Sequence, residues 1–395
     1  MISVTGSQMQ LVAINWHVYL LTKSPLALGG VGLVRVVPII LCSLVGGVVA
    51  DAVDRKRLMI GTQAVMLLIA ASLAVLTAFG LSSIWPIYLL TAIASAALAF
   101  DSPARQALLP ELVPQEDFQN AVSLGIVVFN SAMIVGPALA GLLLSRGPAL
   151  IYGINAGSFV AVLTALMLMS KRRRTETEQE APQISFSALR DGLRFVWRTP
   201  IIVQSMTLDF VATFFASATV LLPIFAAEIL NVGPRGLGLL HASPGIGSVI
   251  AGLMMVRLGI TRRQGKVVLA SVAVYGAATV AFGLSRWFWL SLLMLALTGA
   301  ADTVSTVLRQ TIRQLATPDR LRGRMTSVNM IFFMGGPQLG ELEAGSLAAL
   351  IGARLSVLTG GLGCLIAVAL TGLLAKRLLH YEGDVHKEII QTSTQ

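Results

Sequence analysis

Long apolar stretches recur along the whole chain, separated by glycine, proline or charged residues. A helix needs about 20 mainly apolar residues to cross a membrane, and each stretch is about that long. The pattern therefore predicts a chain built from membrane-spanning helices. Twelve are predicted, at residues 3 to 22, 27 to 50, 58 to 80, 84 to 105, 121 to 145, 149 to 170, 202 to 227, 236 to 257, 265 to 284, 287 to 308, 325 to 350 and 353 to 375.

The first predicted helix differs from the others because its beginning is polar. Ser3, Thr5, Ser7, Gln8 and Gln10 all lie in its first half. We therefore expect this helix to be tilted, or to be a truncated helix whose first turns precede residue 1.

Composition excludes a soluble fold for this chain. Of its 395 residues, 55% are apolar and only 12% are charged. Soluble domains carry about 25% charged residues, so the polar surface that would keep this chain in water is missing. The sequence thus predicts an all-α integral membrane protein with no sizeable soluble domain, surrounded by the lipid bilayer.

The net charge of +10 is explained by the position of the basic residues relative to the spans. Of 29 Lys and Arg residues, 23 lie in one set of alternating loops and 5 in the other set. Basic residues collect in cytoplasmic loops. We therefore expect a multi-pass protein of the inner (cytoplasmic) membrane with both termini in the cytoplasm, and no nucleic-acid partner.

The two halves of the sequence repeat each other. Composition alone does not readily match a Trp, an Arg-Gln pair and a Gly-Pro pair at nearly constant spacing, so we predict two pseudo-symmetric six-helix bundles. The matching residues are Trp85 with Trp289 and Arg105-Gln106 with Arg309-Gln310 at an offset of 204, and Gly136-Pro137 with Gly336-Pro337 at an offset of 200.

This repeat sets the predicted domain boundaries. The bundles cover residues 1 to 170 and 201 to 376, and residues 377 to 395 form a cytoplasmic tail. Between the bundles, a charged linker at residues 171 to 200 ends in a segment, 186 to 197, that alternates apolar residues with arginine. That alternation is typical of a helix lying in the membrane interface.

Signatures of enzymes and metal sites are missing from the sequence. No zinc-protease motif, nucleophile elbow or phosphate-binding loop of the right spacing occurs, and the two cysteines, Cys42 and Cys364, both lie in apolar runs. We therefore expect a protein that is not an enzyme and holds no metal or other cofactor. Any uphill work must draw on an ion gradient, most simply the proton gradient.

Two motifs resemble the major facilitator superfamily. The segment GGVVADAVDRKR, residues 46 to 57, is similar to the superfamily's loop after its second helix, although Asp54 replaces the usual second glycine. The segment GPALAG, residues 136 to 141, is similar to its antiporter signature, with Ala140 in place of one glycine. The stretches at residues 24 to 38, 100 to 114 and 340 to 345 resemble the branch of enterobactin exporters and macrolide-efflux proteins.

The resemblance implies gating roles for residues near these motifs. It implies that Asp51 meets the N-terminus of the eleventh helix, where a carboxylate interacts favourably with the helix dipole. Arg55 and Arg57 could pair across the two halves, although positive-inside anchoring alone explains them. Gly136 and Pro137 accompany export in relatives, and they could equally be a packing element or kink that lets helices 5 and 11 approach closely.

Charged residues inside the predicted spans point to function most sharply, because each costs about 2.5 to 3.5 kcal/mol at the membrane centre. Asp209, Glu341 and Glu343 are candidates for proton coupling. Glu341 and Glu343 point about 200° apart on a helix, so we place Glu341 towards the cavity and Glu343 against other helices. Asp101 and Asp302 lie near predicted cytoplasmic helix ends, where we expect gate pairs with Arg105 and Arg309.

Further polar residues in the spans are candidates for lining a substrate cavity. Each could instead only hydrogen-bond a neighbouring helix, and we give that interpretation the greater weight for any single asparagine. The cavity candidates are Arg35, Asn15, Asn130, Asn155 and Gln338.

Together these features predict a monomeric secondary transporter. The favoured function is proton-coupled export of an amphipathic small molecule, such as a drug, a macrolide or a siderophore, by alternating access of two bundles. One alternative is a uniporter or importer that moves a small solute down its gradient. Another is a membrane scaffold or receptor on the same fold that transports nothing.

Overall fold

The computed structural model describes residues 1 to 169, 193 to 259, 263 to 318, 321 to 379 and 381. Side chains of residues 43 to 52 and of a few others in α4, in α13 and at residue 218 are not described. The described backbone is helical, with no strand among its elements. The predicted linker at residues 171 to 200 and the predicted tail lie mostly outside these ranges.

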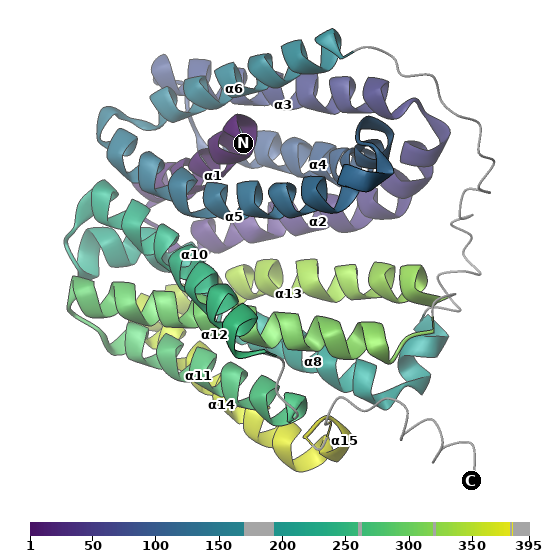
Figure 1. Cartoon of the computed structure of the whole chain (residues 1–395). Coiled ribbons are helices and arrows are strands. Elements are labelled where there is room, and N and C mark those ends of the chain that lie inside the picture. Colours follow the sequence, from purple (N-terminus) through teal and green to yellow (C-terminus); the bar gives the residue numbers. More distant parts are fainter. Residues whose placement is uncertain (170–192, 260–262, 319–320, 380, 382–395) are drawn as a thin grey trace. The chain divides into compact units, whose positions relative to one another are not determined.

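The first half of the chain forms six long helices, one over each predicted span (Figure 1). Two short 3₁₀ turns, η1 (Gln115–Asp117) and η2 (Leu144–Arg146), flank the fifth helix. The helices are α1 (Ile2–Thr22), α2 (Pro25–Ala52), α3 (Arg55–Ala78), α4 (Ile84–Leu112), α5 (Phe118–Leu143) and α6 (Pro148–Leu168).

The second half adds six further helical runs over the remaining predicted spans. The elements are α8 (Pro200–Phe215), η3 (Ala218–Leu221), α9 (Leu222–Ile224), the π-helical turn η4 (Phe225–Ile229), α10 (Gly233–Leu258), α11 (Gln264–Leu284), α12 (Phe288–Leu315), α13 (Arg322–Ile351), α14 (Ala353–Leu374) and α15 (Lys376–Leu379).

Ten of these runs are long and apolar enough to cross a membrane, counting only described residues. The chain is therefore an all-helical, multi-pass membrane protein. The two runs outside that count are α1, with the polar beginning noted above, and α13, which carries Glu341 and Glu343.

The seventh predicted helix, at residues 202 to 227, is interrupted in the structure. α8 ends at Phe215, and a 3₁₀ turn, a short α turn and a π turn complete the run to Ile229. The Ser217 hydroxyl lies 2.6 Å from the Thr213 carbonyl oxygen and 3.0 Å from that of Pro337. Pro223 has no backbone N–H to continue a regular ladder, so the run changes its helical type here.

The helices group into two compact units. The first comprises Met1–Ile184 and Val220–Ala242, and the second comprises Ser185–Thr219 and Ser243–Gln395. The break after α8 therefore coincides with a change of unit, between Thr219 and Val220. The predicted boundaries at residues 170, 200 and 376 stay a prediction.

The repeated Gly-Pro pair has the same packing role in each unit. In the first unit, a side-chain carbon on Gly136 of α5 would lie 2.5 Å from Cβ of Gln8 in α1. In the second unit, a side-chain carbon on Gly336 of α13 would lie 2.5 Å from the Thr213 hydroxyl oxygen in α8. Glycine thus lets one helix lie directly against its neighbour in each unit, as small residues do in membrane proteins. The predicted approach of α5 and α13 to each other stays a prediction.

The second unit has a core that includes the end of the described chain. α8 packs against α13 and α14, and α11 packs against α12 and α14. Leu378 and Tyr381 are buried in this core, and the Leu378 backbone N–H donates to the side-chain oxygen of Gln204 in α8 at 3.2 Å. The first residues of the predicted tail are therefore part of the folded unit.

Helices α10 and α12 pack closely in the second unit through glycine. A side-chain carbon on Gly247 of α10 would overlap the backbone of Ala296, and one on Gly299 of α12 would overlap the backbone of Pro244. The Ser248 hydroxyl donates to the Gly299 carbonyl oxygen at 3.1 Å across the same contact. Because backbone atoms face both glycines, no side-chain rotation can make room for a methyl group.

We therefore expect Gly247→Ala to lower the free energy of unfolding by about 1 to 3 kcal/mol, the usual cost of overpacking a tight core. The matched control is Gly252→Ala, five residues along the same helix, where a side-chain carbon would meet nothing within 4 Å. Thermal unfolding of the two purified variants in detergent measures the difference. Equal stability of both variants would contradict the close contact.

Candidate functional site

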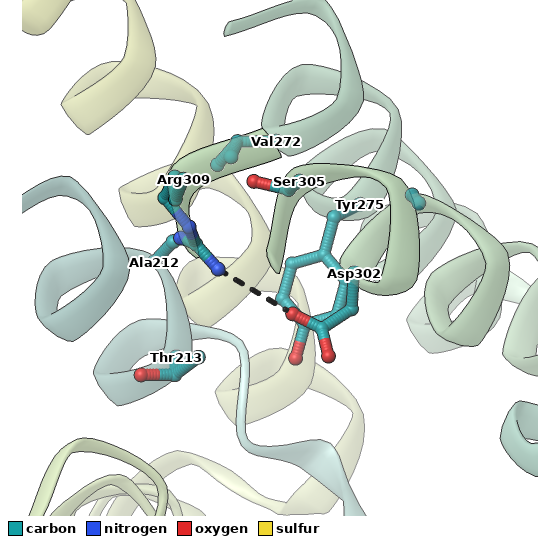
Figure 2. Close-up of a pocket in the computed structure, with 8 residues that line it drawn as sticks. Ala212, Thr213, Val272, Tyr275, Asp302, Ser305 and Arg309 are labelled. Atoms are coloured by element: carbon teal, nitrogen blue, oxygen red, sulfur yellow. Dashed lines mark ion pairs between the residues drawn. The ribbon is translucent and has the colours of Figure 1, made fainter. Parts of the chain in front are cut away.

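A cluster of buried charges lies inside the second unit, between α8 and α12. Asp209 of α8 is paired with Arg309 of α12 at 2.8 Å and lies 4.0 Å from Arg313. Arg309 also lies 3.8 Å from Asp302, which is at the midpoint of α12 (Figure 2). The cluster contains two carboxylates and two guanidinium groups, so its formal charges cancel.

The sequence of α12 explains why these groups share one face of the helix. Positions three, four or seven residues apart lie on the same side of an α-helix. Asp302, Ser305, Arg309 and Arg313 follow this spacing, and Leu308 and Ile312 beside them are buried. The polar face therefore points into the unit rather than towards lipid.

The members of the cluster are buried to very different degrees. The side chains of Asp209, Arg309 and Arg313 are 5%, 1% and 5% exposed, whereas that of Asp302 is 49% exposed. Removing one partner of a buried ion pair leaves an uncompensated charge, so the three buried groups depend on each other. Among the described residues, Asp302 has a 3.8 Å contact with Arg309 and a 3.4 Å hydrogen bond from the Thr306 hydroxyl.

A small pocket opens beside Asp302. Its lining residues come from α8, α11 and α12, and Figure 2 shows the Arg309 and Asp302 side chains approaching each other across it. The space measures about 10 Å³, enough for roughly one water molecule. It is far too small for a drug or a siderophore. The lining residues are Ala212, Thr213, Val272, Tyr275, Ala301, Asp302, Ser305 and Arg309.

Two buried polar atoms of the pocket have no protein partner among the described residues. They are the Ser305 hydroxyl oxygen and Nε of Arg309. A buried polar group that makes no hydrogen bond is destabilising, so such atoms are ordinarily satisfied by water or a ligand. The pocket therefore suits one small polar molecule or ion, such as water.

The first unit holds a different arrangement around Asp101 of α4. Its carboxylate is fully buried and accepts hydrogen bonds of 2.9 Å from the Thr62 hydroxyl and from the Gln63 amide of α3. It also pairs with Arg105, whose side chain is half exposed. The structure thus places Asp101 beside Arg105, while the gating role of the pair stays a prediction.

Both acids lie farther from the helix ends than the predicted spans implied. α4 continues to Leu112 and α12 to Leu315, so Asp101 and Asp302 lie well inside their helices. The helix α12 continues because Leu308 and Ile312 stay buried while Gln310 and Gln314 face outwards. The end of a span predicted from uninterrupted apolar residues is placed too early when the helix continues as an amphipathic segment.

The substrate-cavity candidates lie in different surroundings. Asn155 of α6 is buried and donates to the Gln10 side-chain oxygen of α1 at 2.8 Å, so it ties two helices together. Asn15 is buried in α1, and Asn130 is exposed on α5. Gln338 is partly buried in α13, and its side-chain oxygen has no hydrogen bond to a described residue. No pocket among those described joins them.

The remaining charged candidates are partly buried. Arg35 of α2 and Glu341 of α13 each interact with other groups of the protein. Glu343 lies two residues after Glu341 in the same helix. Of the predicted charged candidates, the structure brings Asp209 and Arg309 together.

The loop that resembles the superfamily motif is described only in part. The Asp51 side chain lies outside the described residues. Asp54 caps α3, accepting a 2.9 Å hydrogen bond from the Arg57 backbone N–H, which explains why an aspartate is suitable there. Arg55 is partly buried and Arg57 is exposed. The Lys56 ammonium donates to the Met169 carbonyl oxygen at the end of α6 at 2.6 Å.

Sequence reasoning missed several polar contacts. Arg313 lies four residues after Arg309, a spacing that could have identified it as part of the same face. The Tyr19 hydroxyl donates to Glu228 at 2.7 Å in the first unit, and the Lys23 ammonium lies 4.1 Å from the Tyr19 ring centroid. Tyr19 and Glu228 are 209 residues apart in sequence, so no local pattern signals their contact.

The chain is similar to known transporters in sequence and in fold. It is 27% identical to the enterobactin exporter EntS of Salmonella choleraesuis over 325 residues, covering 82% of this chain and 77% of that protein. It is 26% identical to the uncharacterised MFS-type transporter YfiS of Bacillus subtilis, covering 95% and 91%. A bacterial homologue of the human lysosomal transporter Spinster, solved in an inward-facing, unoccupied conformation, shares the fold with a TM-score of 0.71 at 14% identity, covering 95% and 96%.

The family comparison covers nearly the whole sequence. Residues 1 to 387 match the family described as transmembrane secretion effector, one of the MFS families. The chain therefore belongs to the transmembrane secretion effector family of the major facilitator superfamily and is a membrane transporter, not an enzyme.

Proposed function

We propose that this transporter exports an amphipathic small molecule and is driven by protons that enter the cell. The observation that carries the proposal is the charge cluster of Asp209, Asp302, Arg309 and Arg313 inside a membrane-spanning unit. Charges inside a membrane protein are costly and mark ion or substrate pathways. A carboxylate in such a cluster can gain a proton on one side of the membrane and lose it on the other.

The proposed energy source is sufficient for export. One charge moving through 100 mV releases about 2.3 kcal/mol, which supports a substrate gradient of nearly fiftyfold. Asp209 and Asp302 are the acids in the cluster, and Glu341 and Glu343 remain further candidates on α13. No ATP-binding element is needed for this cycle.

The proposed substrate is of the siderophore class, because one relative is named an enterobactin exporter and shares about a quarter of its residues with this chain. The proposal includes twelve spans in two six-helix bundles, cytoplasmic termini, a location in the inner membrane and a monomeric state. Uniport or import is the alternative, and it differs because transport would then be independent of the proton gradient.

Secretion of enterobactin tests the transport function. In a bacterial strain that lacks its own enterobactin exporter, expression of this chain should restore enterobactin in the medium, and a protonophore should abolish the effect. Secretion that persists with the protonophore would indicate a facilitator. No secretion of enterobactin, with unchanged tolerance to macrolides and other drugs, would contradict export.

Asp209→Asn tests whether the cluster is needed for the fold as well as for coupling. Loss of one member of a buried ion pair costs about 3 to 5 kcal/mol, so we expect lower thermal stability and no proton-driven secretion. The matched control is Asp209→Asn with Arg309→Gln, which restores neutrality and should recover most of the stability but not the secretion. Full secretion by the single variant would exclude Asp209 from the mechanism.

Cysteine labelling tests the proposed orientation. Arg286 and Pro318 are exposed residues after α11 and α12, on predicted opposite sides of the membrane. After replacement of Cys42 and Cys364, we expect Arg286→Cys to react with a membrane-impermeant maleimide in intact cells. Pro318→Cys should react only in inverted vesicles, and the reverse pattern would place the termini outside.

A further inference from the structure

The two carboxylates of the charge cluster are held very differently. Asp209 is buried between two guanidinium groups and balances one of their two charges. Asp302 is half exposed, lies 3.8 Å from Arg309 and accepts one long hydrogen bond from Thr306. Neutralising Asp209 would strand two buried cations, whereas neutralising Asp302 would remove only a weak contact. Asp302 is therefore the acid that can change its charge without dismantling the cluster.

One atom connects both acids. Nη2 of Arg309 lies 2.8 Å from Asp209, 3.8 Å from Asp302 and 3.0 Å from the Thr306 hydroxyl. This nitrogen carries only two hydrogens, so the three acceptors compete for it. The Thr306 hydroxyl can accept from Arg309 while donating to Asp302. A change of charge on Asp302 is thus transmitted to the ion pair between α12 and α8.

The surroundings of Asp302 contain few other ionisable groups. On α11, Tyr275 lines the pocket. On α8, Asp209 is paired with Arg309. α12 itself carries Arg309 and Arg313. Where α10 packs against α12, the described contacts come from Pro244, Gly247 and Ser248, none of which titrates in the physiological range. The charge on Asp302 is therefore balanced mainly through Arg309.

The pocket supplies the means of proton exchange. Asp302, Tyr275, Ser305 and Arg309 all line it, and Ser305 Oγ and Arg309 Nε have no other partner in the described part of the chain. Its size and these polar groups suit a single water molecule or hydronium ion. A proton can therefore reach the Asp302 carboxylate from a hydronium ion in the pocket, which then remains there as a water molecule.

We propose that Asp302, together with Ser305 and Tyr275, forms the proton-binding site of this transporter, and that Arg309 and Thr306 are positioning residues that transmit its charge state to Asp209. The hydronium ion gives one proton to the carboxylate, forming a neutral carboxyl group and water, and the reverse step releases it. This inference rests on the proposed proton-driven function, but it concerns binding and can be tested without transport.

Infrared difference spectroscopy tests the site directly in the purified full-length protein. As the pH is lowered, wild type should gain the carbonyl stretching band of a protonated carboxyl group, and the band should shift in D₂O. The chain has 19 Asp and Glu residues, so the other carboxyl groups also contribute to this band. Asp302→Asn should lack the Asp302 component, which is seen in the difference between the wild-type and variant spectra. Asp302→Glu restores a carboxyl group, so its spectrum should contain the band at a changed frequency. If Asp302→Asn does not fold, this frequency change in Asp302→Glu tests the site instead.

Thr306→Val is the matched test of the positioning role. It removes the hydroxyl between Arg309 and Asp302 but keeps the shape of the side chain, so the band should remain while the pH of its midpoint shifts. An unchanged midpoint would overturn the role of Thr306.

The result separates this inference from the proposed function. A band that is unchanged in Asp302→Asn, or a wild type without any such band, would overturn the proton site. A component of the band that is present in wild type and absent from Asp302→Asn supports the site, even if neither protein secretes enterobactin. In that case the proposed substrate would be wrong and the proton site would stand.

Discussion

The ion pair between Asp209 and Arg309 is the interaction on which the second unit depends. Both side chains are almost fully buried, with 5% of Asp209 and 1% of Arg309 exposed. In a bilayer there is no solvent to replace a lost partner, so the two helices that carry these residues must stay close enough for the pair to persist. The glycine contacts between neighbouring helices serve the same requirement, since Gly336 and Gly299 allow α8 and α12 to be enclosed by α13 and α10 without steric overlap.

The same physical constraint separates structural charges from functional ones. Arg313 and Asp209 are enclosed, and each has a charge of opposite sign within reach. Asp302 lies at the edge of this arrangement, beside the small pocket. In the first unit, Asp101 is buried with two neutral donors and one half-exposed arginine. The repeated Arg-Gln pair of the sequence thus has one arginine at the protein surface and one in the interior.

The helical architecture could be predicted from the sequence because apolar length is a local property. Every predicted span corresponds to a helical run, and most boundaries agree within a few residues. The interruption after Phe215 was not predicted, although Pro223, which cannot continue a regular hydrogen-bond ladder, is visible in the sequence. Of the site, Asp209 was identified by its cost in a membrane, and Arg309 was identified only as the expected gate partner of Asp302. The pairing of Asp209 with Arg309 was not predicted. Spacing within one helix can show which residues share a face, whereas contacts between helices 100 residues apart leave no local signal.

The contact of Leu378 with Gln204 bears on how the second unit is made. These residues are 174 positions apart, and the Leu378 side chain is enclosed in the same core as α8. Membrane helices leave the ribosome in order, so α8 enters the bilayer long before Leu378, which contacts Gln204 of α8, has been synthesised. During that interval Gln204 of α8 lies against the insertion machinery, lipid or a chaperone instead of Leu378. The described core of this unit is therefore complete only after Leu378 has been made, and a ribosome that stalls before this residue would leave an inserted but unfinished protein in the membrane.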